Sequence, residues 1–150
     1  MKNEYNDYEI TGILPVINIP TAELAVPVAK ALNDGGVCSI EVTLRSADSL
    51  VSLERIKQAF PGMSVGAGTV LDIKTVDAAL EAGADFIVSP GYDEEIVNYC
   101  INKGVLTVPG CTTASAVQHA AKKGLSVLKF FPAELSGGIM LLPKRQCSTW

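Results

Sequence analysis

The sequence has few residues of the kinds that build metal centres and disulfide frameworks. It contains one histidine and four cysteines in 150 residues, and no two cysteines form a C-x-x-C pair. Zinc sites and disulfide frameworks normally show their ligands or cysteines at such regular spacings. We therefore interpret the cysteines as reduced structural thiols, at Cys38, Cys100, Cys111 and Cys147.

Excess positive charge and long apolar runs are also lacking. The formal net charge is −4, whereas nucleic-acid-binding proteins neutralise phosphates with clustered basic residues. No apolar run reaches the length of about 18 residues that a transmembrane helix needs, and residues 1–9 lack the pattern of a signal peptide. We expect a soluble, cytoplasmic protein that binds neither nucleic acid nor a membrane.

What the sequence does contain is a regular alternation of two patterns. Hydrophobic residues make up 48% of the chain, which suits one globular domain over residues 1–150. Short β-branched runs predict six strands, at 13–19, 39–45, 64–70, 86–91, 106–112 and 127–133. Amphipathic segments predict the intervening helices, at 22–33, 48–60, 73–82, 93–103 and 114–123. This alternation indicates right-handed crossovers and a parallel sheet.

The second predicted strand distinguishes a closed barrel from an open doubly wound sheet. Alternate side chains of a strand point to opposite faces, so residues 39–45 have one polar face, made of Glu41, Thr43 and Arg45, and one aliphatic face. A parallel strand covered by helices on both sides would be apolar on both faces. The polar face therefore indicates the interior of a (β/α) TIM barrel, incomplete here with about six of the eight parallel strands of that architecture.

The third predicted strand is interpreted in the same way. Val65, Ala67 and Thr69 are expected to share one face, while Gly66 and Gly68 leave room for another part of the chain to approach the backbone. The hydroxyl of Thr69 then lies near the carboxyl end of the strand, where polar residues gather in barrels. The alternative for Thr69 is an ordinary β-branched strand residue.

A lysine stands in the middle of the last predicted strand. Lys129 shares a face with Val127 and Phe131 and points into the same interior as Glu41 and Arg45. Burial favours the neutral form of an amine, and a neutral amine beside a keto group can form an imine that permits cleavage of the adjacent carbon–carbon bond. The alternative is a structural lysine whose ammonium group reaches solvent at the strand end.

Two charged side chains on the second strand complete this constellation. Glu41 can act as general acid and base for the carbinolamine and for a substrate hydroxyl. Its alternative role is a salt bridge to Arg45 or Lys129, and both roles can hold together. Arg45 offers a planar guanidinium that suits a carboxylate, and Thr69 adds a neutral donor beside it.

Five short segments carry a family resemblance. They are IEVTLR at 40–45, VGAGTV at 65–70, SPG at 89–91, VPG at 108–110 and KFFPAE at 129–134. With them, the chain from about Ile13 to Gly138 resembles the 2-keto-3-deoxy-6-phosphogluconate aldolases, class I aldolases that often also cleave 4-hydroxy-2-oxoglutarate. Each segment is weak alone, but the set is highly specific.

The resemblance implies a lyase with a defined site. It makes Lys129 the imine former and Glu41 the proton shuttle, while Arg45 and Thr69 hold the carboxylate end of the pyruvate moiety. Thr113 is a further candidate for a substrate contact. The resemblance also implies a small-molecule 2-keto acid as substrate, no metal or other cofactor, and a homotrimer of barrels. The expected products are pyruvate with glyceraldehyde 3-phosphate, or pyruvate with glyoxylate.

The sequence departs from the family's pattern after Gly138. Barrels of this type have eight strands, and their phosphate-binding loops usually follow strands seven and eight, which are not predicted here. Residues 1–138 are family-like, but the tail at 139–150 has no amphipathic period and contains Pro143. We interpret this ending as the result of a frameshift or premature stop. The alternative to an active aldolase is then a catalytically inactive fragment that associates only with intact homologues.

Two smaller features complete the comparison with the family. The segment at 111–116 lacks the proline and glutamate expected there, and His119 is interpreted as a surface or packing histidine. Another phosphate-binding barrel, such as a relative of thiamine phosphate synthase, ranks last because the chain does not reach a glycine-rich phosphate loop.

Overall fold

The computed structural model describes residues 12–140. Its strands are β1 (Val16–Ile17), β2 (Ser39–Thr43), β3 (Ser64–Gly68), β4 (Phe86–Ser89) and β5 (Leu106–Pro109). Its helices are α1 (Ala25–Asp34), α2 (Ser49–Ala59), α3 (Ile73–Glu81), α4 (Glu94–Asn102) and α5 (Ala114–Lys122), with short 3-10 helices η2 (Ala22–Leu24), η3 (Glu134–Ser136) and η4 (Gly138–Met140). Most of the tail predicted at 139–150 lies outside the described residues. None of the described helices is both long and apolar enough to cross a membrane.

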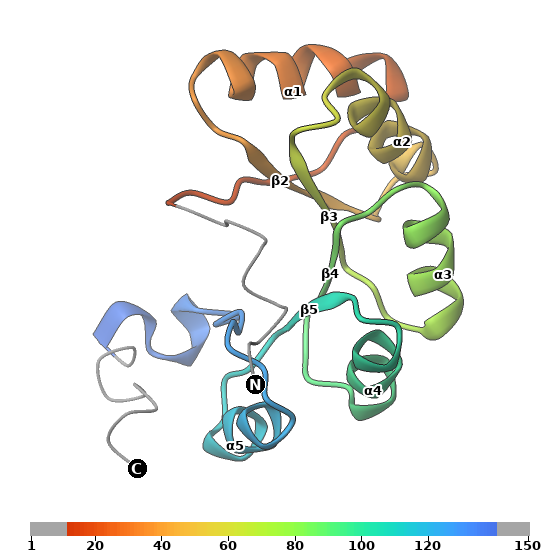
Figure 1. Cartoon of the computed structure of the whole chain (residues 1–150). Helices are drawn as coiled ribbons and strands as arrows, with labels where there is room; N and C mark the ends of the chain where they lie inside the picture. The colour runs from red at the N-terminus through yellow and green to blue at the C-terminus, as the bar shows by residue number, and fades with distance from the viewer. Residues whose placement is uncertain (1–11, 141–150) are drawn as a thin grey trace.

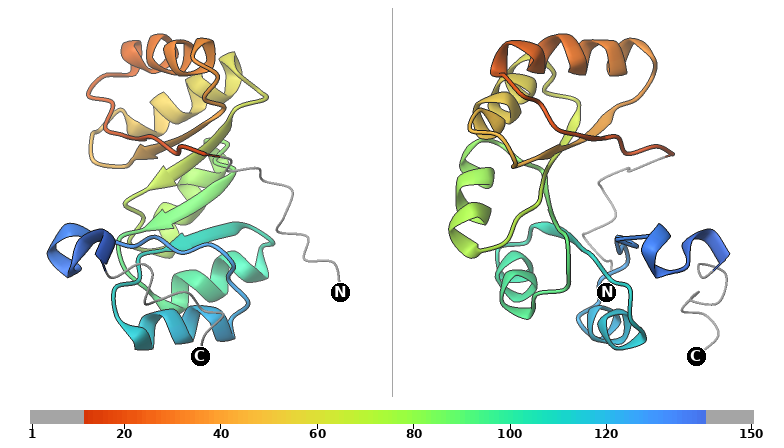
Figure 2. Two further views of the ribbon diagram at one scale, coloured as in Figure 1. Left: turned by 90° about the vertical axis from the view of Figure 1, so that its left-hand side faces the viewer. Right: turned by 180° about the vertical axis from the view of Figure 1, so that it is seen from behind.

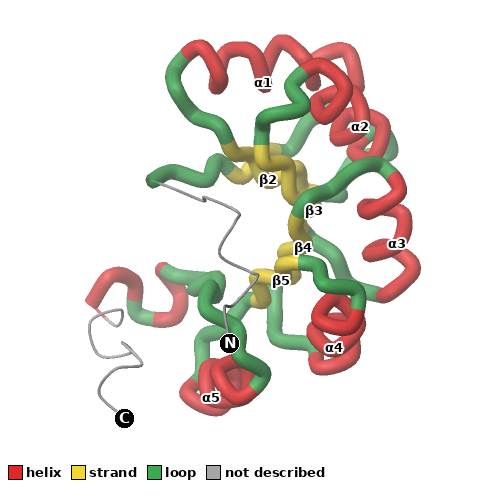
Figure 3. The backbone as a smooth tube through the Cα atoms, viewed as in Figure 1, coloured by secondary structure: helices red, strands yellow, loops and turns green. Residues whose placement is uncertain are grey.

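The five strands form one parallel sheet in chain order, β1-β2-β3-β4-β5. The sheet curves, and α1 to α5 follow one another along its outer, convex side (Figures 1 and 3). The same arc is visible from behind (Figure 2). An open doubly wound sheet would carry helices on both faces. The sequential order and one-sided cover are those of a TIM-barrel wall, which confirms the predicted fold class.

Side chains of the sheet divide between two cores. The outer core, between sheet and helices, contains strand residues Ile40, Val42, Val65, Ala67 and Ile87 and helix residues Leu53, Ile56, Val76, Ala79 and Ile96. The inner core, on the concave side, contains Phe86, Val88, Leu106 and Val108 with Leu14 packed against them. Glu41 lies between two residues that face the helices, so its side chain points to the inner side. The face predicted for Glu41 is confirmed.

The prediction that Val65, Ala67 and Thr69 share one face is wrong for Thr69. β3 ends at Gly68, and Thr69 has a φ of 63°, the single positive φ of a non-glycine residue within residues 12–140. A β-branched residue rarely adopts this conformation, and it ends the alternation of the strand. Val65 and Ala67 pack under the helices, whereas Thr69 turns towards the inner side.

Polar side chains that follow the strands begin the next helices. Asp72 accepts a hydrogen bond from the backbone N–H of Thr75 at 2.7 Å, which holds the pKa of Asp72 below its usual range. Asp93 caps α4 in the same way. Thr113 caps α5, where its hydroxyl oxygen accepts from the backbone N–H of Ala116 at 3.1 Å. These caps set the residue at which each loop that follows a strand becomes a helix.

The strand predicted at 127–133 is reduced to one parallel bridge between Gly110 and Lys129. The Lys129 N–H donates to the Pro109 carbonyl at 3.0 Å, and the Lys129 carbonyl accepts from the Cys111 N–H at 2.8 Å. No other residue of this segment joins the sheet within the part of the chain that the structure describes. The two hydrogen bonds nevertheless anchor Lys129 beside β5, in the position of a sixth strand.

Candidate active site

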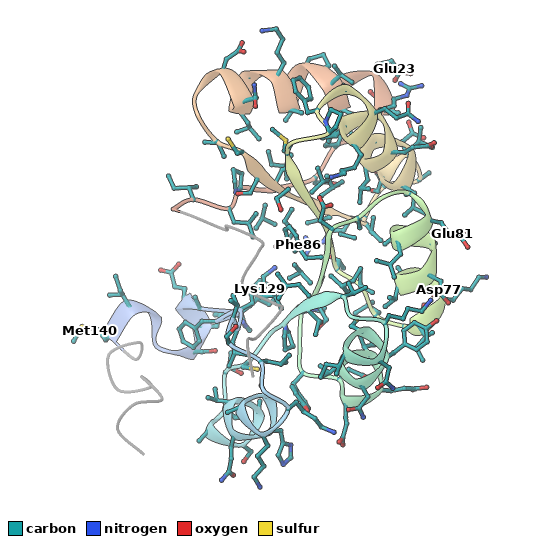
Figure 4. All side chains as sticks on the ribbon, in the orientation of Figure 1. Glu23, Asp77, Glu81, Phe86, Lys129 and Met140 are labelled. Carbon is teal, nitrogen blue, oxygen red and sulfur yellow. The ribbon has the colours of Figure 1, made fainter. Side chains whose placement is uncertain are left out.

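A cavity of about 190 Å³ opens on the inner side of the sheet. Its lining comes from the strands and from the segments that follow them: Val16, Glu41, Thr43, Arg45, Thr69, Pro90, Lys129 and Phe131. Figure 4 shows Lys129 and Phe86 on the inner side, whereas Glu23, Asp77 and Glu81 lie on the outer side. The cavity thus lies where barrels place their reactive groups, at the carboxyl ends of parallel strands.

Lys129 and Glu41 form an ion pair inside this cavity. The Lys129 Nζ lies 3.0 Å from Oε1 and 3.3 Å from Oε2 of Glu41. The Glu41 side chain is 2% exposed and the Lys129 side chain 23% exposed, so the carboxylate is enclosed while the amine borders the opening. The salt bridge considered as the alternative role of Glu41 is therefore present, and at this distance the two groups can exchange a proton directly.

An aromatic ring borders the lysine on another side. The Lys129 Nζ lies 5.2 Å from the ring centre of Phe131, within the range of a cation–π contact. Phe131 shares the face of Lys129, as the alternation of strand residues predicted. The ammonium group is thus placed between a carboxylate and a ring, and its remaining exposure is towards the cavity that a substrate would enter.

Arg45 and Thr69 meet at the mouth of the cavity. The Arg45 Nε donates to the Thr69 Oγ1 at 3.2 Å, a contact that depends on the unusual φ of Thr69. Arg45 is exposed, and no salt bridge joins it to a carboxylate among residues 12–140. An arginine and a hydroxyl placed this way can bind the carboxylate of a small acid.

The remaining candidates lie away from this cluster. Thr113 does not line the cavity, because its hydroxyl caps α5, so a substrate contact by Thr113 stays a prediction. His119 lies on α5, with its ring centre 5.9 Å from that of Tyr92. This contact agrees with the interpretation of His119 as a packing residue.

Four lining residues were not predicted as parts of the site. Phe131 and Thr43 could have been found, because each shares a strand face with a candidate residue. Val16 and Pro90 carry no such signal, since their place in the lining depends on how the first strand and the loop after β4 curve around the opening.

Fold and cavity together define a β/α-barrel protein with an interior lysine–carboxylate pair at the carboxyl ends of its strands. Residues 6–147 match the sequence profile of the family described as KDPG and KHG aldolase, in which KDPG is 2-keto-3-deoxy-6-phosphogluconate. The chain belongs to this aldolase family, and the predicted resemblance is confirmed.

Individual relatives of known sequence and structure support the same family assignment. The 2-dehydro-3-deoxy-phosphogluconate aldolase of Treponema pallidum is 40% identical over 134 residues, covering 89% of this chain and 64% of the relative. The 2-keto-3-deoxy-6-phosphogluconate aldolase structure from Zymomonas mobilis ATCC 29191 has a TM-score of 0.83 at 40% identity, over 87% of this chain and 63% of that chain. A KDPG aldolase from Legionella pneumophila, solved with pyruvate captured as a covalent carbinolamine intermediate, has a TM-score of 0.84 at 36% identity, over 87% and 64%. The chain spans less than two thirds of the length of these relatives.

Proposed function

We propose that this protein is a class I aldolase that cleaves a 2-keto acid through an imine on Lys129. The observation that carries the proposal is the 3.0 Å contact between the Lys129 Nζ and the enclosed Glu41 carboxylate, inside a cavity at the strand ends. The Legionella relative, captured with pyruvate as a covalent carbinolamine, supports covalent chemistry with a keto acid in this family.

Imine formation requires a neutral amine and a group that carries its proton. Glu41 takes a proton from the Lys129 ammonium group, and the freed Nζ attacks the C2 carbonyl of the keto acid. Protonated Glu41 then donates to the carbinolamine hydroxyl, which leaves as water. The product is a protonated imine beside a Glu41 carboxylate that is ready to act again.

Cleavage uses the same two residues. Glu41 accepts the proton of the C4 hydroxyl, the C3–C4 bond breaks, and its electron pair moves towards the protonated imine to give an enamine. The aldehyde leaves, Glu41 returns its proton to C3, and water hydrolyses the imine to release pyruvate and restore Lys129. No step requires a group other than the amine, the carboxylate and water.

Arg45 and Thr69 are proposed to bind the substrate carboxylate. Their hydrogen bond at 3.2 Å places a planar cation and a hydroxyl at one side of the cavity. Pockets for drug-sized ligands run from about 300 Å³ upwards, so the cavity of about 190 Å³ suits a small pyruvate moiety. We propose 2-keto-3-deoxy-6-phosphogluconate, 4-hydroxy-2-oxoglutarate or both as the complete substrates, in keeping with the family.

Reductive trapping tests the proposed function. The protein is incubated with pyruvate, reduced with borohydride, digested and examined by mass spectrometry. We expect the peptide that contains Lys129 to gain the mass of a reduced pyruvyl group, while peptides with Lys57 and Lys123, which pair with carboxylates elsewhere, gain none. An unmodified Lys129 peptide under conditions that label a known class I aldolase would contradict the proposal.

Replacing Arg45 tests the carboxylate site separately. The Arg45→Gln variant loses a charge-assisted hydrogen bond to the substrate, worth about 1.5–3 kcal/mol. We expect KM for the keto acid to rise about 10- to 100-fold with a smaller change in kcat. The matched control is Arg55→Gln on α2, whose guanidinium contacts Glu23 on the outer side and which should leave KM unchanged. An Arg45→Gln variant with the wild-type KM would remove Arg45 from the site.

A further inference from the structure

The inner face of β3 carries two glycines where side chains would otherwise stand. A Cβ on Gly66 would overlap the ring of Phe86, which extends from β4. A Cβ on Gly68 would overlap the carboxylate of Glu41, which extends from β2. The interior space opposite β3 is therefore filled by the side chains of its two neighbouring strands. The space at Gly68, which is the nearer of the two to the carboxyl end of β3, is called the Gly68 slot. It holds the carboxylate of Glu41, the proposed proton shuttle.

Contacts in the Gly68 slot involve the whole end of the glutamate side chain. A Cβ at position 68 would lie 2.8 Å from both Cγ and Cδ of Glu41, and closer still to Oε1. Real Cβ atoms essentially never come this close to carbon atoms, so the carboxylate lies directly against the backbone of β3. A methyl group at position 68 would therefore require the end of the Glu41 side chain to move.

The strand register explains why position 68 matters for Lys129. Glu41 is paired with Gly66 in the ladder, and Gly68 is paired with Thr43. The Glu41 side chain therefore leans by two residue pairs towards the carboxyl end of the sheet, which is where the Lys129 Nζ lies. Only a residue without a side chain at position 68 leaves that direction open.

We propose that Gly68 is a positioning residue: the slot made by its missing side chain sets the Glu41 carboxylate within hydrogen-bond distance of the Lys129 Nζ. The catalytic consequence of this geometry rests on the proposed function. A methyl group at position 68 would displace the carboxylate from the wall of the barrel. Displacement by about 1 Å in an active site can cost about 100-fold in rate.

A double-mutant cycle tests the slot. We expect Gly68→Ala to lower kcat about 100-fold in the wild-type background. In a Glu41→Ala background the added methyl group has nothing to displace, so Gly68→Ala should then change the residual kcat by less than about 3-fold. Gly62→Ala is the matched control, because a Cβ there meets no atom within 4 Å, and it should leave kcat unchanged.

The cycle also covers the case in which Gly68→Ala does not fold. In that case the proposal predicts that adding Glu41→Ala restores folding, because it removes the overlapping atoms. Thermal unfolding of the wild type, the two single variants and the double variant measures this. Equal losses of kcat in both backgrounds, wild-type kcat in Gly68→Ala, or a double variant that stays unfolded would each overturn the proposal. Failure of pyruvate trapping on the wild-type protein would instead overturn the proposed function, while the unfolding measurements would still report on the slot.

Discussion

Replacing Lys129 by arginine is expected to abolish both reductive labelling by pyruvate and turnover of 2-keto acids. Arginine keeps a positive charge beside Glu41 and Phe131, so the ion pair that encloses the carboxylate is retained. A guanidinium does not lose its proton in proteins, however, and so cannot become the nucleophile. We expect kcat to fall on the order of 10⁴-fold or more, in line with the removal of other covalent nucleophiles.

Lys123→Arg is the matched control for this variant. Lys123 also pairs with a glutamate, Glu94, at 3.0 Å, but it lies beyond α5 and outside the cavity. Its replacement should leave labelling and turnover as in the wild type. A Lys129→Arg protein that folds, shows the wild-type unfolding curve and still turns over substrate would show that the imine forms elsewhere or not at all.

Replacing Glu41 by glutamine is expected to slow every step that moves a proton while leaving Lys129 able to form the imine. Glutamine has nearly the same shape and can still accept a hydrogen bond from the Lys129 Nζ, but it cannot carry a proton between the amine, the carbinolamine and the C4 hydroxyl. General acid–base groups typically contribute about 10²- to 10⁴-fold, and we expect a loss of kcat in this range. Single-turnover trapping should then show slower labelling that still reaches Lys129.

Glu23→Gln is the control for the glutamate variant, because Glu23 is exposed on the outer side of the molecule. It should have wild-type kcat. If Glu41→Gln kept kcat within about 3-fold of the wild type, well below the usual contribution of an acid–base group, Glu41 would be only the ionic partner of Lys129. If it lost labelling completely, Glu41 would be indispensable for imine formation itself and would not only set its rate.

The faces of β2 were predictable from the sequence because all five of its residues adopt regular strand geometry and are buried. Alternation therefore places Glu41 and Thr43 on one side and the aliphatic residues on the other without further information. Lys129 could be placed by the same alternation, since its bridge to Gly110 preserves the local strand direction. The fold class followed from these faces, because a barrel wall can have a polar face towards its interior, whereas a parallel sheet covered by helices on both sides is apolar on both faces.

Other features depend on information that alternation does not contain. Thr69 reaches the cavity through a positive φ, and a β-branched side chain gives no sequence signal for that conformation. The strand predicted at 127–133 needed backbone partners beyond position 129 that residues 12–140 do not supply. The role of Gly68 depends on the direction in which Glu41 leans, which the strand pattern leaves open. The homotrimer stays a prediction, because a single chain does not show its neighbours.

The contact between Glu41 and Lys129 joins residues 88 positions apart in the chain. The strands β3, β4 and β5 and the helices α2 to α5 all lie within the loop that this contact closes. Closing so long a loop has an entropic cost that the intervening units must offset before the contact becomes stable. The contact is therefore stable only in a chain whose intervening units have folded, so a measurement of the distance between the two side chains reports on the folding of the segment that separates them.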